Sequence, residues 1–174
     1  MTLTDTTVAA STLNTLDGNT TGTIDATSLT KLTGTSADAK TAFDSAGINL
    51  TFDASSYLAG YSDLLAAFGT DLTAAKAHYF ANGVSEGRSF DAFDENSYLA
   101  GYSDLLAAFG TNTDSALVHY INNGYSEGRS ADAFDENSYL ASNTSLIGTV
   151  TDAAAHYVTC LLYTSDAADE LSCV

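Results

Sequence analysis

The sequence YLAGYSDLLAAFGT occupies residues 57–70 and recurs without a change at residues 98–111, an offset of 41 residues. A third, more divergent copy begins at Phe134. Self-similarity at a period of this length is typical of chains built from stacked supersecondary units, because each unit is too small to bury its apolar face alone. The period predicts helical repeats over residues 51–159, with copies at 52–92 and 93–133 and a truncated copy at 134–159.

The pattern within each copy predicts a helical hairpin. Asp53 and Asp94 stand where a helix begins, and a short carboxylate there accepts hydrogen bonds from the free N–H groups of the first turn. Gly69 is expected to end the first helix of its copy. Gly83 and Gly124 are expected just after the second helix, at a position whose positive φ favours glycine.

Residues 1–50 are rich in Thr, Ser and Asp, and Phe43 is their one aromatic residue. Apolar spacing predicts three short helices here, at 8–16, 26–32 and 37–46. The fold class expected for the chain is therefore all-α. A small polar helical segment at 1–50 precedes short helical-hairpin repeats that pack side by side.

The charge of the chain excludes some partners. There are 22 acidic residues against five basic ones, a formal net charge of −17. Nucleic acid is not expected as a partner, because phosphate binding requires Lys and Arg. Membrane insertion is not expected either, because no apolar run has the length of a transmembrane helix. The acidity favours solubility, with cation binding by some carboxylates as the alternative.

Both cysteines, Cys160 and Cys173, lie within the last fifteen residues, so the preceding chain has no disulfide framework. The third copy follows the repeat as far as Thr159, and the sequence then changes to CLLYTSDAADELSCV. This tail resembles a translated sequencing adapter, and we expect residues 160–174 to be non-native. The alternative is a genuine C-terminal helix capped at Ser165.

A short stretch after the first expected helix is a candidate calcium loop. In the helix–loop–helix calcium motif, oxygen ligands stand at positions 1, 3, 5 and 9, with a bidentate acidic ligand at position 12. Asp17, Asn19, Thr21 and Asp25 fit the first four positions. Ser28 stands where the bidentate carboxylate belongs, so we expect weak calcium binding at best and no other cofactor. The alternative is an ordinary turn.

Three histidines, His78, His119 and His156, recur at one position of the repeat. Packed helices lie about 8–10 Å apart, whereas all ligands of one zinc ion lie about 2 Å from it, so equivalent histidines are badly placed to share a metal. We expect each histidine to pack beside a tyrosine. The recurrent tyrosines are expected in the core, with sugar or protein binding as the alternative role: Tyr57, Tyr61, Tyr98, Tyr102 and Tyr139.

The two arginines of the chain, Arg88 and Arg129, both end the sequence Glu-Gly-Arg. An arginine just after a helix can donate several hydrogen bonds to a carboxylate. Asp94 and Asp135 open the next copies and are the expected partners, which predicts a clamp between units. Anion or sugar binding by the arginines is the alternative.

The repeat pattern FD…YL…DL…AFG…HY…G..EGR resembles units that recur in bacterial secreted and surface proteins, often beside repeats-in-toxin segments and in some cases beside glycosyltransferases. The resemblance covers residues 52–159. In the first copy it rests on these matches: Phe52-Asp53, Tyr57-Leu58, Asp63-Leu64, His78-Tyr79, Gly83 and Glu86-Gly87-Arg88. The resemblance implies a larger parent protein and an extracellular or cell-surface location.

No catalytic motif is present: the sequence has no Walker loop, dinucleotide fingerprint, metalloprotease helix or nucleophile elbow. The chain is therefore not expected to be an enzyme. The expected function is that of a noncatalytic repeat, spacer or adhesion segment of a larger secreted or cell-surface bacterial protein, with a protein or glycan surface as partner. The alternatives are an accessory binding module of a secreted carbohydrate-active enzyme and a weak calcium-binding module.

Overall fold

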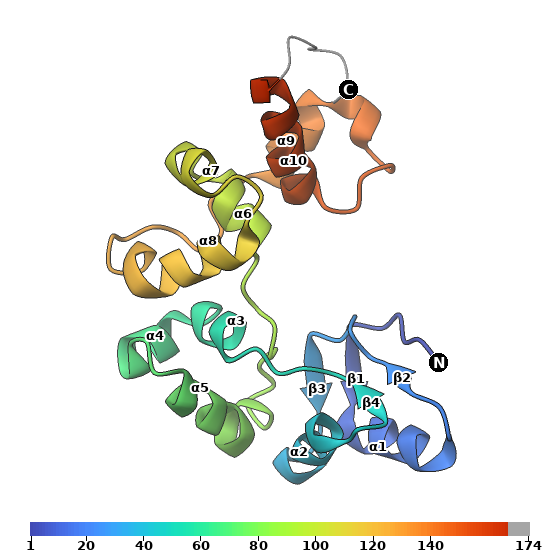
Figure 1. The fold of residues 1–174 in the computed structure, drawn as a ribbon. Helices are drawn as coiled ribbons and strands as arrows, with labels where there is room; N and C mark the ends of the chain where they lie inside the picture. Colours follow the sequence, from blue (N-terminus) through green and yellow to red (C-terminus); the bar gives the residue numbers. More distant parts are fainter. Residues whose placement is uncertain (167–174) are drawn as a thin grey trace. The chain divides into compact units, whose positions relative to one another are not determined.

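A computed structural model describes residues 1–166 and the side chains as far as Cys160, so Cys173 lies outside the described residues. The chain is mostly helical and divides into two compact units, Met1–Phe93 and the part from Asp94 onward (Figure 1). This division coincides within a residue with the predicted boundary between the first and second repeats. The first unit therefore contains both the polar segment at 1–50 and the first repeat.

The first fifty residues alternate short strands with helices. The prediction of a helix at 26–32 is wrong, because this range contains the start of a strand and no helix. The chain as a whole is therefore mostly helical, with short strands, rather than all-α. Val8 and Ala9 also belong to a strand instead of the expected first helix at 8–16. The elements are β1 (Thr7–Ala9), α1 (Ala10–Asn19), β2 (Ile24–Asp25), β3 (Lys31–Thr33), α2 (Ser36–Asp44) and β4 (Ile48–Asn49).

The strands pair in two parallel ladders that share one register. Val8 lies opposite Leu32 in the β1–β3 ladder, and Ile24 lies opposite Ile48 in the β2–β4 ladder, an offset of 24 residues in both. Each strand has only two or three residues, and its partner strand lies 24 residues away in the sequence. Local apolar spacing does not carry that information, which is why helices were predicted instead.

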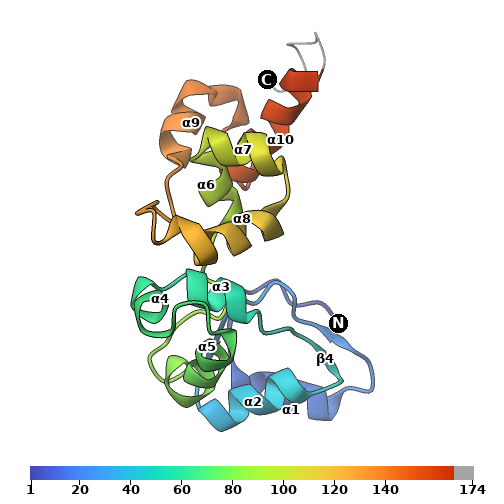
Figure 2. The same ribbon diagram turned by 60° about the vertical axis from the view of Figure 1, so that its left-hand side comes forward.

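The first repeat contributes three short helices and a turn of π-helix: α3 (Ala54–Ala59), α4 (Ser62–Phe68), α5 (Leu72–His78) and η1 (Tyr79–Gly83). Figure 2 shows α3, α4 and α5 beside α1 and α2 of the same unit. Asp53 caps α3 as predicted, because its carboxylate accepts from the N–H groups of Ser55 and Ser56. Gly69 ends α4 as predicted, with a φ of 60°.

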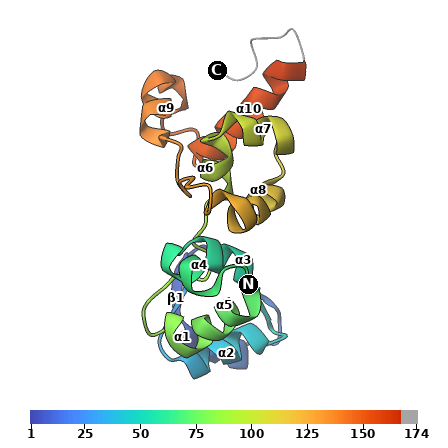
Figure 3. The same cartoon turned by 90° about the vertical axis from the view of Figure 1, so that its left-hand side faces the viewer.

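The second unit holds the second and third copies. Asp94 caps α6 as predicted by accepting from the N–H of Ser97. Helix α10 packs against α6, which joins the two copies within this unit (Figure 3). Packing of all three copies in one row stays a prediction. The elements are α6 (Glu95–Ala100), α7 (Ser103–Phe109), α8 (Thr113–His119), η2 (Tyr120–Gly124), α9 (Glu136–Ser142), η3 (Thr144–Leu146) and α10 (Ala153–Asp166).

Two of the recurrent tyrosines lie in the core of the complete copies, as predicted. The others, Tyr61, Tyr102 and Tyr139, are only partly buried. Tyr57 and Tyr98 are fully buried. Tyr57 meets Tyr79 edge-on with the ring centroids 5.1 Å apart, and Tyr98 meets Tyr120 in the same way at 5.0 Å. Edge-to-face pairs of this kind add to the stabilisation that burial alone provides.

Gly83 lacks the positive φ that we predicted for it, whereas Gly87 and Gly128 have φ values of 69° and 75°. Gly83 ends η1 with the hydroxyl of Tyr57 directly against it, and a Cβ at this position would lie 2.5 Å from that oxygen. Close packing, rather than backbone conformation, therefore requires the glycine.

Phe43 of α2 joins the polar segment to the first repeat within the first unit. Its ring centroid lies 5.1 Å from that of Phe90, 5.7 Å from that of Phe80 and 5.8 Å from that of Phe52. Phe80 and Phe90 are positions at which the first copy departs from the second, which has Ile121 and Ala131 there. The first copy therefore differs from the second where it contacts the segment that precedes it.

Candidate functional site

A tyrosine–histidine hydrogen bond recurs in all three copies. The Tyr57 hydroxyl lies 2.9 Å from Nδ1 of His78 and links α3 to α5. The rings of these two residues also stack, with centroids 6.2 Å apart, so the predicted packing of histidine beside tyrosine is present. The equivalent pairs, with distances of 2.9 and 2.8 Å, are Tyr98–His119 and Tyr139–His156.

Arg88 forms a salt-bridge network inside its own copy. Its guanidinium donates to both carboxylate oxygens of Asp63, at 3.0 and 2.7 Å, and to Glu86 at 2.6 Å. It also lies over the ring of Tyr61, 4.6 Å from the centroid. The predicted clamp onto Asp94 of the next copy is wrong, because Arg88 fastens the start of α4 to the end of its own repeat.

Arg129 has the same arrangement in the second copy. It pairs with both carboxylate oxygens of Asp104, at 3.0 and 2.8 Å, and with Glu127 at 2.6 Å. Asp135, the partner we predicted, instead caps α9. A signal for the correct partner exists in the sequence: the third copy lacks Glu-Gly-Arg and has Ser145 where the complete copies have aspartate.

These contacts change how the carboxyl groups ionise. Hydrogen bonds from Arg88 lower the pKa of Asp63, and Arg129 lowers the pKa of Asp104 in the same way. A lowered folded-state pKa contributes stability above the unfolded-state pKa of about 3.9, and that stability is lost as the pH falls through the folded-state value.

We expect Arg88→Gln to lower the stability of the first unit most at neutral pH, because the pair with Asp63 is then fully ionised. The difference from the wild type should shrink below about pH 4, as the carboxyl group becomes protonated in both proteins. Denaturant unfolding across pH measures this difference. Arg129→Gln is the matched variant in the second unit, and a difference that stays constant with pH would contradict the assignment.

Two buried tyrosines of the first copy provide a matched pair of tests. Tyr57 shares its hydroxyl with His78, whereas the hydroxyl of Tyr79 is buried without a hydrogen-bond partner of standard geometry. We expect Tyr57→Phe to cost about 1–2 kcal/mol of unfolding free energy, because Nδ1 of His78 loses its partner. Tyr79→Phe should be neutral or stabilising by up to about 1 kcal/mol, because no hydrogen bond of standard geometry is lost. Equal losses in chemical denaturation would contradict both assignments.

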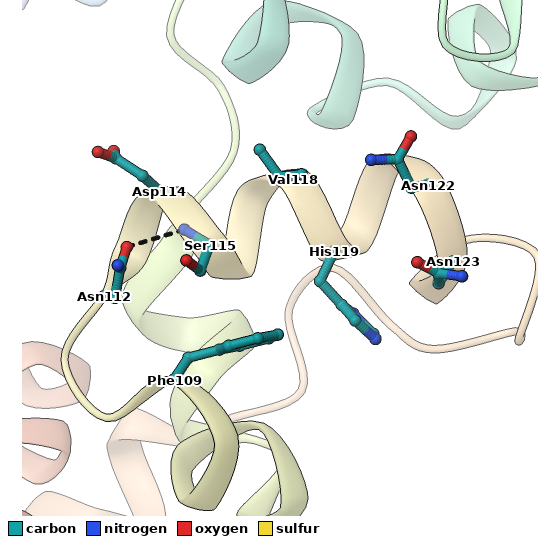
Figure 4. A pocket seen from close by; sticks show the side chains of 8 residues that line it. All are labelled: Phe109, Asn112, Asp114, Ser115, Val118, His119, Asn122 and Asn123. Atoms are coloured by element: carbon teal, nitrogen blue, oxygen red, sulfur yellow. Dashed lines mark hydrogen bonds between the residues drawn. The ribbon is translucent and has the colours of Figure 1, made fainter.

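A surface hollow of about 440 Å³ lies along α8 in the second copy. In Figure 4, Phe109 at the end of α7 lies across from Ser115 and His119, and Asn112 accepts from the N–H of Ser115. Val118 stands on the other side of the helix in this view and is 54% exposed. The remaining lining is polar and carries amide and carboxylate groups that suit hydrogen bonding: Asp114, Asn122 and Asn123.

Several residues that line this hollow differ between the complete copies. Ser115, Val118 and Asn122 correspond to alanines at positions 74, 77 and 81 of the first copy. Phe109 and His119, which pack against each other with centroids 5.7 Å apart, are unchanged as Phe68 and His78. The supporting residues are thus shared while the exposed side chains vary.

The residues of the predicted calcium loop lie on α1, on β2 and on the connection between them. Asp17 and Asn19 belong to α1, Asp25 belongs to β2, and Thr21 lies in the connection between them. The Asp17 carboxylate accepts from the hydroxyl of Ser45 at 2.6 Å, and the Asp25 carboxylate accepts from the hydroxyl of Thr27 at 2.8 Å. Among the described residues, no group of three or more His, Cys, Asp or Glu side chains could hold a metal ion.

We expect calcium to produce neither heat in calorimetry nor a shift in melting temperature below millimolar concentrations. The reason is that the Asp17 and Asp25 carboxylates already have hydroxyl partners, and tight calcium sites need six or more oxygen ligands. Asp17→Asn with Asp25→Asn is the control variant. Saturable binding in the micromolar range that this double variant abolishes would contradict the expectation.

Comparisons with protein-family models, with curated proteins and with solved structures find no match to this chain. Within the described residues, no helix is both long and apolar enough to cross a membrane. The candidate site is therefore defined by its own geometry: a repeated Tyr–His and Arg–Asp framework that supports a variable polar face on α8.

Proposed function

We propose that this chain is a noncatalytic interaction segment of a larger secreted or cell-surface bacterial protein. Its repeats act as a scaffold and spacer, and the α8 face of the second copy contacts a protein or glycan surface. The proposal is supported by one observation above all. The two complete copies share the Tyr–His and Arg–Asp framework and differ on the exposed lining of the hollow, at Ser115, Val118 and Asn122.

That distribution is what an adhesion module requires. The buried Tyr98 and the surface Arg129–Asp104 pair fix the helices, while the other exposed positions are free to change without loss of packing. Polar side chains beside an aromatic residue suit hydroxyl-rich or amide-rich surfaces, because they supply both hydrogen-bond donors and acceptors. An accessory role beside a secreted carbohydrate-active enzyme would use the same face.

The test is binding of the full chain to an array of glycans and extracellular proteins. The informative variant combines Ser115→Ala, Val118→Ala and Asn122→Ala, which gives the second copy the residues of the first at these positions. Binding should fall at least about tenfold in this variant and remain in Leu72→Ala, an exposed substitution outside the hollow. A blank array, or binding that the triple variant leaves unchanged, would contradict the proposal.

A further inference from the structure

The β–α segment at the start of the first unit has two parallel ladders that differ in the number of paired segments. The β2–β4 ladder has a third strand-like layer, because Thr2 pairs in parallel with Asp25 on the outer side of β2. Among the residues that the structure describes, the β1–β3 ladder has two strands. The β2–β4 ladder thus has a third paired segment beside β2, and the β1–β3 ladder has no described equivalent beside β1.

Residues 1–3 repeat the hydrogen bonds of a complete turn. Asp25 donates its N–H to the carbonyl of Met1 at 2.7 Å, and Leu3 donates its N–H to the carbonyl of Asp25 at 2.8 Å. One turn later, Ala26 donates in the same sense to the carbonyl of Asn49 at 3.1 Å. Residues 1–3 therefore occupy the position that the end of a preceding 24-residue turn would occupy.

The buried side chains follow the same stacking. Leu3, Ala26 and Leu50 hold equivalent positions in the three layers, with exposed fractions of 9%, 0% and 8%. In the other ladder, Leu32 is fully buried, whereas Val8 of the outer strand is only partly buried. The incomplete burial lies at the place where the third layer is missing.

The edge of the β1–β3 ladder on the β3 side is already occupied by Phe90 and Asp91. The carbonyl of Thr30, just before β3, accepts from the N–H groups of Phe90 at 2.8 Å and Asp91 at 3.3 Å. On the near side, Thr6 accepts from the N–H of Lys31 at 3.1 Å, so the alternation of a parallel ladder turns the N–H of Thr7 away from β3. The outer edge of β1 is thus the one at which this ladder can extend.

We infer that the outer edge of β1 docks one further β–α turn of about 24 residues, built on the same pattern as residues 6–29. The incoming strand would accept from the N–H of Thr7 as Thr6 accepts from that of Lys31, and its apolar side chain would cover Val8. Its own last residues would take the place that residues 1–3 occupy now. The partner is therefore a chain segment with this repeat chemistry, and the inference is independent of the adhesion face on α8.

The experiment inserts a second copy of residues 6–29 between Asp5 and Thr6 of the full chain. The inserted turn should fold in register, with amide exchange slowed at least about tenfold relative to an unstructured segment. The melting temperature of the chain should stay equal or rise, and the circular dichroism signal should gain the helix of the added turn.

Two controls make the result decisive. Thr7→Pro removes the N–H that points away from β3, so it should have little effect on the original chain and should abolish protection of the inserted turn. The second control is an inserted turn whose Leu13 and Ile24 equivalents are aspartate, which cannot be buried and should exchange freely. An insertion that exchanges as fast as this second control, or that unfolds the parent chain, would overturn the inference.

Discussion

Phe43→Ala should lower the unfolding free energy of the first unit by about 3 kcal/mol. This value is the lower end of the range for phenylalanine truncation, because Phe43 is only partly buried. The ring contacts Phe52, Phe80 and Phe90 at centroid distances of 5.8, 5.7 and 5.1 Å. Its removal leaves a cavity between α2 and the first repeat. Hydrogen exchange resolved by segment, together with denaturant unfolding, measures the loss and locates it.

Phe134→Ala is the matched control for this prediction. Phe134 packs on Tyr157 with ring centroids 4.9 Å apart, entirely within the second unit. Its truncation should raise exchange in the second unit and leave the first unchanged, the reverse of the pattern for Phe43. A loss under about 1 kcal/mol for Phe43→Ala would show that the polar segment and the first repeat are not coupled through this ring.

Gly83→Ala should destabilise the first unit by about 3 kcal/mol through overpacking alone. The added Cβ would lie 2.5 Å from the Tyr57 hydroxyl and 3.0 Å from Cδ2 of Tyr79. Neither ring has room to retreat, since both are fully buried and Tyr57 is held by His78. Gly124→Ala should have the same effect in the second unit, where the hydroxyl of Tyr98 is the obstructing atom.

Gly18→Ala separates overpacking from the intrinsic effect of replacing glycine. Gly18 lies in α1, and a Cβ there meets no atom within 4 Å. This substitution should stabilise the chain by about 0.5–1 kcal/mol, because alanine is the better helix former. Melting temperatures of the three variants provide the comparison, and a Gly83→Ala protein as stable as the wild type would disprove the close contact with Tyr57.

The two arginines of the chain make the same set of contacts in the two complete copies. Each guanidinium binds an aspartate through both oxygens and stacks over a tyrosine, so each complete copy uses its single arginine to fix α4 or α7. Exposed ion pairs of this kind contribute modestly to stability, and their geometry serves mainly to orient the helices. The α8 face and the β1 edge are then the two surfaces on which partners are proposed.

The sequence by itself determined the 41-residue period, the capping roles of Asp53 and Asp94 and the burial of Tyr57 and Tyr98. These features depend on residues close together in the chain or on exact repetition, and local patterns record both. Tertiary structure alone decided the strands at 1–50 and the close approach that requires Gly83. The partner of each arginine also became evident in the tertiary structure, although the third copy carries a signal for it in Ser145. In each of these cases the deciding contact comes from 24 or more residues away, where local spacing carries no information.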